Sequence, residues 1–125
     1  MSYKCLTIKQ ASINIEKGKY CRNEICQFMD DFRYEDNSKK YNLIDEEIVD
    51  IGDIKMSALL SAIVDYLCYE SSVKVPKWVY YEKYFLKEPY FYPNMKGLRF
   101  IQLLGSPPPF LMRNIFTDGS IMKRV

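Results

Sequence analysis

The sequence predicts an all-α fold: a compact single-domain bundle of about five or six helices, spanning residues 1–125. Apolar side chains recur at spacings of three and four along most of the chain, which is the periodicity of a helix with one buried face. Proline and glycine interrupt these runs, as they do at helix ends. With 125 residues, 48% hydrophobic and 27% charged, the chain can bury a core without metal ions or disulfides.

The N-terminal third predicts three helices. Residues 4–16 have an ambiguous apolar period, for which we favour a short helix that ends before Gly18. Residues 23–34 place apolar and charged side chains on opposite faces and predict an amphipathic helix. Ser38 is a suitable N-cap for a further short helix that runs through residues 41–44.

The longest predicted helix is Ile54–Ser71, with Asp53 as its N-cap. Because this helix is apolar on almost every side, we expect it at the centre of the fold, with Lys55, Asp65 and Glu70 marking the part that meets solvent. The apolar stripe of the helix comprises Ile54, Ala58, Leu59, Ala62, Ile63, Tyr66 and Leu67.

Prolines divide the segment that follows. Pro76 ends the central helix and begins another helical segment, predicted over residues 77–87, because proline fits the first turn of a helix. Pro89 and Pro93 then delimit Tyr90–Tyr92, which we predict to be an extended aromatic linker. Aromatic side chains from residues 78–92 should cover the joint with the rest of the bundle.

The chain closes with a predicted proline-rich helical hairpin. Its first helix runs from residue 95 to 104, capped by Asn94 and ended by Gly105, and its second from residue 108 to about 114. The tail to residue 125 contains a turn at Asp118–Gly119 and fits either a short helix or a strand. Four apolar residues of the first helix are predicted to point inward: Leu98, Phe100, Ile101 and Leu104.

Charge is distributed in blocks, although the net charge is only +2. Residues 35–72 carry three basic and nine acidic side chains, whereas residues 73–125 carry nine basic and three acidic ones. We favour mutual neutralisation of these blocks within the chain, with an acidic partner or phosphate as the alternative.

The residue chemistry argues against an enzyme. The chain has no histidine, no phosphate-binding glycine loop and no dinucleotide fingerprint, so histidine-activated nucleophiles and nucleotide sites of those kinds are excluded. The four cysteines lack zinc-site spacing and predict reduced, mostly buried thiols, so we expect no metal site and no cofactor. With no apolar signal segment at the N-terminus, we expect a cytoplasmic protein without a membrane span. We interpret the carboxylates at residues 45–53 as an acidic face that is exposed to solvent.

Nucleic-acid binding is the main chemical alternative, because basic side chains alternate with aromatic ones in the C-terminal half. Basic side chains gathered on one face would favour this function. Basic side chains paired with the carboxylates of residues 35–53 would favour a structural or protein-binding role. The basic side chains concerned are Lys74, Lys77, Lys83, Lys87, Lys96, Arg99, Arg113, Lys123 and Arg124.

Arg113 and Asn114 close the predicted hairpin and admit two interpretations. Arg113 can bind carbonyl groups at a helix end while Asn114 takes the left-handed cap conformation, which is the interpretation we favour. Alternatively, Arg113 anchors a partner protein, because arginine is favoured at interface hot spots.

Over roughly residues 20–125 the chain resembles a family of small, mostly uncharacterised bacterial helical proteins. These are often encoded beside a nucleotidyltransferase-like protein, an arrangement similar to toxin–antitoxin pairs. The resemblance implies an all-helical fold and a protein partner, and it transfers no catalytic residues. Many members have aromatic and arginine residues where this chain has Phe91 and Arg113. The residues that carry the resemblance are 22–32, 75–79, 85–91, 98–99 and, most specifically, 106–116.

We therefore predict a non-enzymatic protein–protein interaction module, antitoxin-like in its pairing with a nucleotidyltransferase-like partner. A nucleic-acid-binding regulator is the competing prediction. The predicted partner-binding residues are Tyr90, Phe91, Arg99, Arg113 and Asn114.

Overall fold

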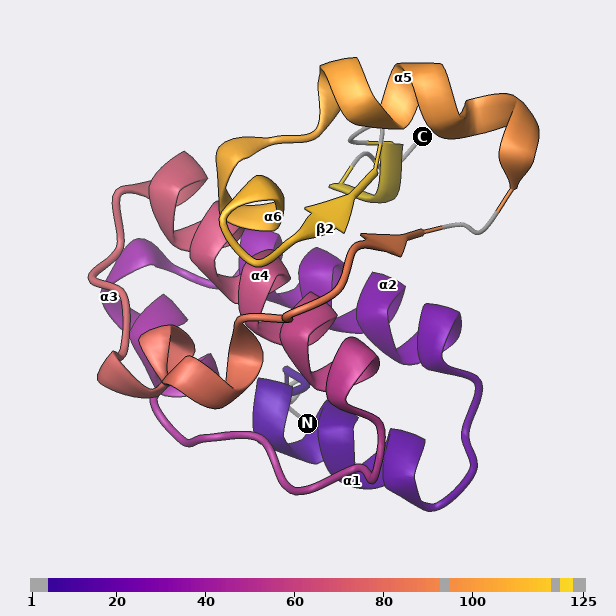
Figure 1. Ribbon diagram of the computed structural model, residues 1–125. Coiled ribbons are helices and arrows are strands. Elements are labelled where there is room, and N and C mark those ends of the chain that lie inside the picture. The colour runs from indigo at the N-terminus through magenta and orange to yellow at the C-terminus, as the bar shows by residue number, and fades with distance from the viewer. Residues whose placement is uncertain (1–4, 93–94, 118–119, 123–125) are drawn as a thin grey trace.

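The structure is a computed structural model that describes residues 5–92, 95–117 and 120–122 (Figure 1). It confirms the predicted all-α fold, since helical segments dominate and only two short strands occur among the described residues. The predicted Asn94 cap and the turn at Asp118–Gly119 lie outside the described residues. In chain order the elements are α1 (Ile8–Glu16), α2 (Cys21–Tyr34), α3 (Asn37–Lys40), η1 (Tyr41–Leu43), α4 (Ile54–Ser71), η2 (Lys77–Tyr80), η3 (Glu82–Tyr84), β1 (Tyr90–Phe91), η4 (Lys96–Leu98), α5 (Arg99–Gly105), α6 (Pro108–Leu111), β2 (Ile115–Phe116) and η5 (Ser120–Met122), where η denotes a 3-10 helix.

Helix α4 is the central element, and its predicted bounds are confirmed at both ends. Asp53 caps it as predicted, because its carboxylate accepts hydrogen bonds from the backbone N–H groups of Lys55 (3.0 Å) and Met56 (3.3 Å). Two predictions for this helix are wrong. Ile54 is 70% exposed, since it precedes the first buried turn, and Asp65 is buried because it pairs with an arginine described below.

Helices α1 and α2 pack together and contribute Ile8, Phe28 and Phe32 to the core that surrounds α4. A buried lysine fixes the end of α2: the Lys40 ammonium donates to the backbone carbonyls of Phe32 (2.7 Å) and Arg33 (3.1 Å). The short helix predicted after α2 is present as α3 and η1, with residue 36 in place of the predicted Ser38 at the N-cap position.

The helix predicted over residues 77–87 is replaced by two 3-10 turns, η2 and η3. Tyr81 separates them because its backbone is extended, with φ −64° and ψ 138°. Trp78 anchors this region, as its ring is buried edge-to-face against Tyr84 (5.8 Å) and its Nε1–H donates to the carbonyl of Ile44 at 2.8 Å. Covering of the core by aromatic residues is therefore observed at Trp78 and Tyr84.

The predicted extended linker is confirmed as β1, which pairs in parallel with β2. Tyr90 lies opposite Ile115, and Phe91 lies opposite Phe116. For the tail, the structure has a strand at residues 115–116 and a short 3-10 helix, η5, at residues 120–122, so both predicted alternatives occur.

The closing helices lie on different parts of the molecule. Helix α6 ends at Leu111, earlier than predicted, and packs on α4, with Phe110 fully buried. Helix α5 follows η4 and lies at the periphery (Figure 1). The proline-rich hairpin, in the sense of α5 packed against α6, stays a prediction. Within the described ranges no helix combines the length and apolar character that crossing a membrane requires.

Candidate protein-interaction surface

Helix α5 turns its apolar side chains outward. Phe100 and Leu104 are each 73% exposed, whereas Gln102 is fully buried. At about 100° per residue, the four apolar residues of α5 share one side of the helix and Gln102 faces the opposite way. The prediction that Phe100, Ile101 and Leu104 point inward is therefore wrong, and Leu98, predicted with them, is only partly buried. We define the α5 surface as Met95, Phe100, Ile101, Leu103 and Leu104.

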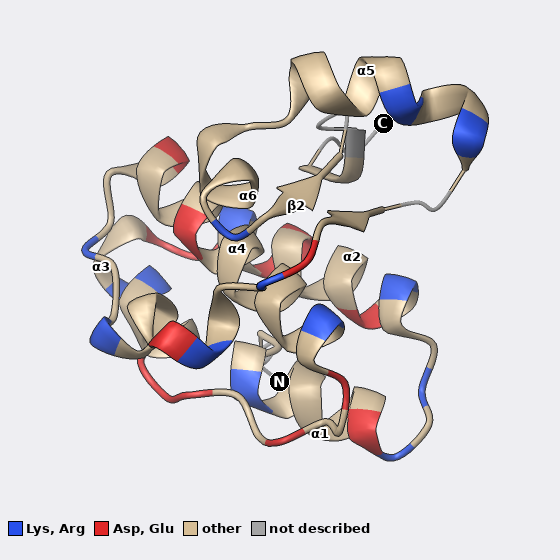
Figure 2. Ribbon diagram, in the orientation of Figure 1, with Lys and Arg blue, Asp and Glu red and all other residues tan. Residues whose placement is uncertain are grey.

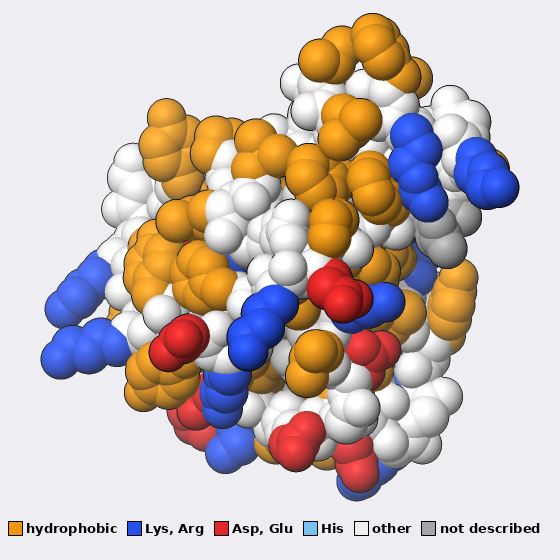
Figure 3. Space-filling model, in the orientation of Figure 1, with side chains coloured by type: hydrophobic (Ala, Val, Ile, Leu, Met, Phe, Trp, Pro, Cys, Tyr) orange, Lys and Arg blue, Asp and Glu red, His pale blue; other side chains and the backbone are white. Residues whose placement is uncertain are grey.

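The α5 surface is part of a larger hydrophobic area. Figure 3 shows hydrophobic side chains gathered over α5 at the top of the molecule. Exposed apolar patches of this kind are uncommon on proteins that bind nothing, and they mark interaction sites. Leu111 and Met112, at the end of α6, are about half exposed as well.

A buried serine holds the C-terminal end of α5 in this orientation. The Ser106 hydroxyl donates to the carbonyl of Gln102, and its oxygen accepts from the backbone N–H of Thr117 at 2.8 Å. Both Ser106 and Thr117 are buried. Since a buried hydrogen bond costs more to break than an exposed one, this serine ties the polar side of α5 to the chain after β2.

An arginine–aromatic stack holds the N-terminal end. The Arg99 guanidinium lies 3.9 Å from the centre of the Phe91 ring, and Phe91 stacks on Phe116 with ring centres 5.0 Å apart. Cation–π contacts of this kind stabilise by about 0.5–1 kcal/mol at partly exposed sites. Two of the predicted binding residues, Phe91 and Arg99, are thus brought together, where they fix the helix that carries the α5 surface.

Tyr90 belongs to a different contact, because successive strand residues point to opposite faces. Its ring packs edge-to-face on Tyr92 (6.1 Å) and lies 5.6 Å from the Lys55 ammonium. Burial, followed by the neighbouring Tyr92 phenol and Asp53, raises the pKa of Tyr90 to about 12. Tyr90 therefore joins β1 to the start of α4 and lies apart from the Arg99 stack.

Arg113 takes the structural role that we favoured for it. Its side chain is fully buried, so it offers no surface to a partner. Burial lowers the pKa of its guanidinium, and the adjacent carboxylate opposes that shift. The guanidinium donates to the Ser61 hydroxyl (2.7 Å), the Asp65 carboxylate (3.0 Å) and the carbonyls of Pro109 (2.8 Å) and Val79 (2.9 Å).

Asn114 also has a structural role. Its φ of +64° is the left-handed conformation that we predicted, and its half-buried side-chain amide lies 3.5 Å from the carbonyl of Leu86. The turn at Asn114 directs the chain from α6 into β2. Arg113 and Asn114 thus join the segment from α6 to β2 to helix α4 and to the chain before β1. We call these joined elements the frame, and neither residue lies on the α5 surface.

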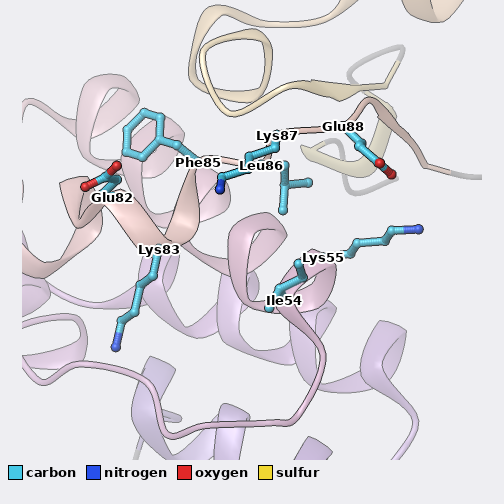
Figure 4. A pocket seen from close by; sticks show the side chains of 8 residues that line it. All are labelled: Ile54, Lys55, Glu82, Lys83, Phe85, Leu86, Lys87 and Glu88. Atoms are coloured by element: carbon cyan, nitrogen blue, oxygen red, sulfur yellow. The ribbon is translucent and has the colours of Figure 1, made fainter.

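A hollow of about 630 Å³ lies beside the start of α4 and is open to solvent. Figure 4 shows that the ammonium groups of Lys55, Lys83 and Lys87 point in different directions around it. The Lys83 ammonium is bound to the Glu47 carboxylate at 2.7 Å. Small-molecule sites have polar groups that converge on the ligand, so this geometry does not favour one here.

The charged groups of the described residues lie in several places, and some of them pair with one another. No cluster of three or more cysteine and carboxylate side chains that could hold a metal ion occurs among the described residues. Positive charges lie on several separate parts of the molecule (Figure 2). One C-terminal base, Lys83, pairs with Glu47 of the acidic segment, and Lys9 pairs with Glu46. One pairing of a C-terminal basic side chain with the acidic segment does not separate the protein-binding role from nucleic-acid binding, and both stay predictions.

The motif that carries most of the resemblance, residues 106–116, contains Ser106, Phe110 and Arg113, which attach this segment to α4 and α5. The residues on which we based the resemblance to a bacterial helical family therefore attach this segment to the core, and the resemblance itself stays a prediction. Comparisons of the chain with models of protein families, with curated proteins and with solved structures found no match.

Proposed function

We propose that this chain is a non-enzymatic protein-interaction module that binds a partner protein through the α5 surface. The observation that carries the proposal is the orientation of α5, which exposes Phe100 and Leu104 while it buries Gln102. Apolar side chains gain free energy when a partner removes them from water.

The expected affinity follows from the size of this surface. An aromatic side chain can bury roughly 150–250 Å², so the α5 surface, with one partly exposed aromatic and four partly exposed aliphatic side chains, presents a few hundred Å² in total. At about 25 cal/mol per Å², burial of this area contributes several kcal/mol. Part of that gain is offset by the lost freedom of the two partners, so binding through this surface alone should be weak to moderate.

The surface is preorganised, which reduces the entropic cost of binding. The Arg99–Phe91 stack and the Ser106 hydrogen bonds fix both ends of α5 before any partner arrives. Following the resemblance, the nucleotidyltransferase-like protein of an antitoxin-like two-gene unit is the first partner to test.

The test is a pulldown with the tagged chain from host-cell lysate at moderate salt, with a parallel nuclease-treated sample. Wild type should retain a stoichiometric protein after nuclease, and the double variant Phe100→Ser/Leu104→Ser should lose it. Tyr69→Ser is the matched control, because Tyr69 is 86% exposed on α4 and lies outside the α5 surface. Circular dichroism should show the same helix content in all three proteins.

Two results would overturn the proposal. Equal retention by wild type and the double variant would place any interface elsewhere. Recovery of material that nuclease removes would support the nucleic-acid regulator instead.

A further inference from the structure

Positive charge borders the α5 surface and acidic residues are absent from its part of the sequence. Residues 89–117 contain three basic side chains, Lys96, Arg99 and Arg113, and not one Asp or Glu. Arg113 is buried and paired with Asp65, and Arg99 lies on the Gln102 side of α5 and stacks on Phe91, so Lys96 sets the charge that a partner meets at the α5 surface. Figure 2 shows basic residues and no acidic ones along η4 and α5.

The positive charge lies at one end of the surface. Lys96 is exposed in η4, next to Met95, and Arg99 opens α5, whereas Leu103 and Leu104 at the other end have no charged neighbour in the sequence up to Arg113. The surface therefore has a direction: a basic end followed by an apolar end. A partner that matches it needs acidic groups at one end and apolar groups along the rest.

The size and charge of the surface argue against a second copy of this chain. A stable dimer usually buries about 800 Å² on each subunit, which is more than the α5 surface offers. A second copy would also offer no acidic side chain to Lys96 from this region, since residues 89–117 contain none. The length fits a smaller partner, because the 3-10 turn η4 and the seven residues of α5 together make about three helical turns.

We infer that the α5 surface takes an amphipathic helix of a partner protein, with apolar residues at spacings of three and four and with Asp or Glu at the end that meets Lys96. This inference rests on the proposed function and specifies its partner. Helix-on-helix docking of this kind is read through apolar anchors one turn apart, which is the spacing of Phe100 and Leu104. An anionic lipid surface offers similar chemistry, but helices that lie on membranes have a polar face rich in Lys and Arg, and α5 has one basic residue, Arg99, among its seven.

The experiment is a nuclear magnetic resonance titration of the isotope-labelled full chain with two synthetic helical peptides. Both peptides have leucine at the same amphipathic positions, and their flanking charges are Glu in one and Lys in the other. The Glu peptide should bind about tenfold more tightly than the Lys peptide, a difference that salt reduces. Shifts should concentrate at residues 95–104. Lys96→Glu should reverse the preference, and Phe100→Ser/Leu104→Ser should abolish binding of both peptides.

Several results would overturn this inference and still leave the proposed function, which the pulldown tests, in place. Equal affinity for both peptides at α5 would remove the acidic requirement and leave the interaction surface in place. Binding of neither peptide would remove the helical partner. In that case, perturbation of α5 by vesicles containing anionic phospholipid would assign the surface to a membrane.

Discussion

Helices α4 and α5 are both rich in apolar residues, yet they orient those residues in opposite ways. Helix α4 buries Leu59 and Ile63 along with two polar side chains, Ser61 and Asp65. Helix α5 buries one polar side chain, Gln102, and exposes its apolar ones. In α4 the Arg113 guanidinium bonds to the side chains of Ser61 and Asp65, whereas at α5 the buried Ser106 hydroxyl bonds to the backbone carbonyl of Gln102 and holds that side of the helix inward.

The comparison teaches that apolar periodicity reveals a helix without fixing which side is buried. A polar group that has a hydrogen-bond partner inside the protein can be buried at little cost. When that group lies on one side of a short helix, the apolar residues on the other side are exposed. In α4 the apolar residues surround the helix, so burial of the polar groups costs no apolar contact. Helix α5 has only seven residues, too few to bury a polar side and an apolar side at the same time.

The largest expected effect concerns the arginine of the α4 frame. Arg113→Met should lower the free energy of unfolding by about 3–5 kcal/mol, because it leaves the Asp65 carboxylate buried without its ion pair. Urea denaturation measures this change. The matched control is Arg99→Met, which removes a partly buried arginine from the α5 side and should cost about 1 kcal/mol or less.

A second measurement separates charge from packing at the same site. The double variant Asp65→Asn/Arg113→Met should recover part of the lost stability, since it removes the unpaired charge. If Arg113→Met and Arg99→Met cost the same, the claimed difference between the two regions does not hold.

The next effect compares one leucine from each helix. Leu59→Ala should cost about 2–5 kcal/mol, because it empties space in a fully buried part of the core. Leu104→Ala should change the free energy of unfolding by about 0.5 kcal/mol or less, because the side chain is already in water. Urea denaturation of the two variants and of wild type measures both. A large cost for Leu104→Ala would mean that α5 buries its apolar side.

Local signals were enough to predict much of the frame. Asp53 as a cap and the long apolar run defined α4, the prolines around Tyr90–Tyr92 defined an extended segment, and Asn114 was predicted in its left-handed conformation. Each of these features depends on residues close together in the sequence. For the same reason the helical class of the fold was predictable.

The remaining features depend on contacts between distant residues. Asp65 and Arg113 are 48 positions apart, so the burial of Asp65 had no local sign. Arg99, Gln102 and Ser106 share one side of a helix at spacings of three and four, a pattern that suits either a solvated face or a buried polar one. The backbone N–H of Thr117, directly after β2, donates to Ser106 and decides between the two.

The smallest effect concerns the ion pair that joins the acidic and basic blocks. Burial alone would raise the pKa of the Glu47 carboxyl, but its bonds to Lys83 and Tyr84 outweigh burial and lower that pKa. A carboxylate with a lowered folded-state pKa stabilises the fold above its unfolded pKa of 4.5, and this contribution is lost as the pH falls through the folded value.

We therefore expect Glu47→Gln to cost stability above pH 4.5, with the gap to wild type narrowing as the pH falls below that value. The gap should be about 1 kcal/mol or less, because the Lys83 side chain is 62% exposed and solvent screens the pair. Urea denaturation of both proteins across this pH range measures the gap, with Glu82→Gln as the control for loss of one surface carboxylate. A gap that widens at low pH would contradict the assignment, since a protonated Glu47 gains nothing from Lys83.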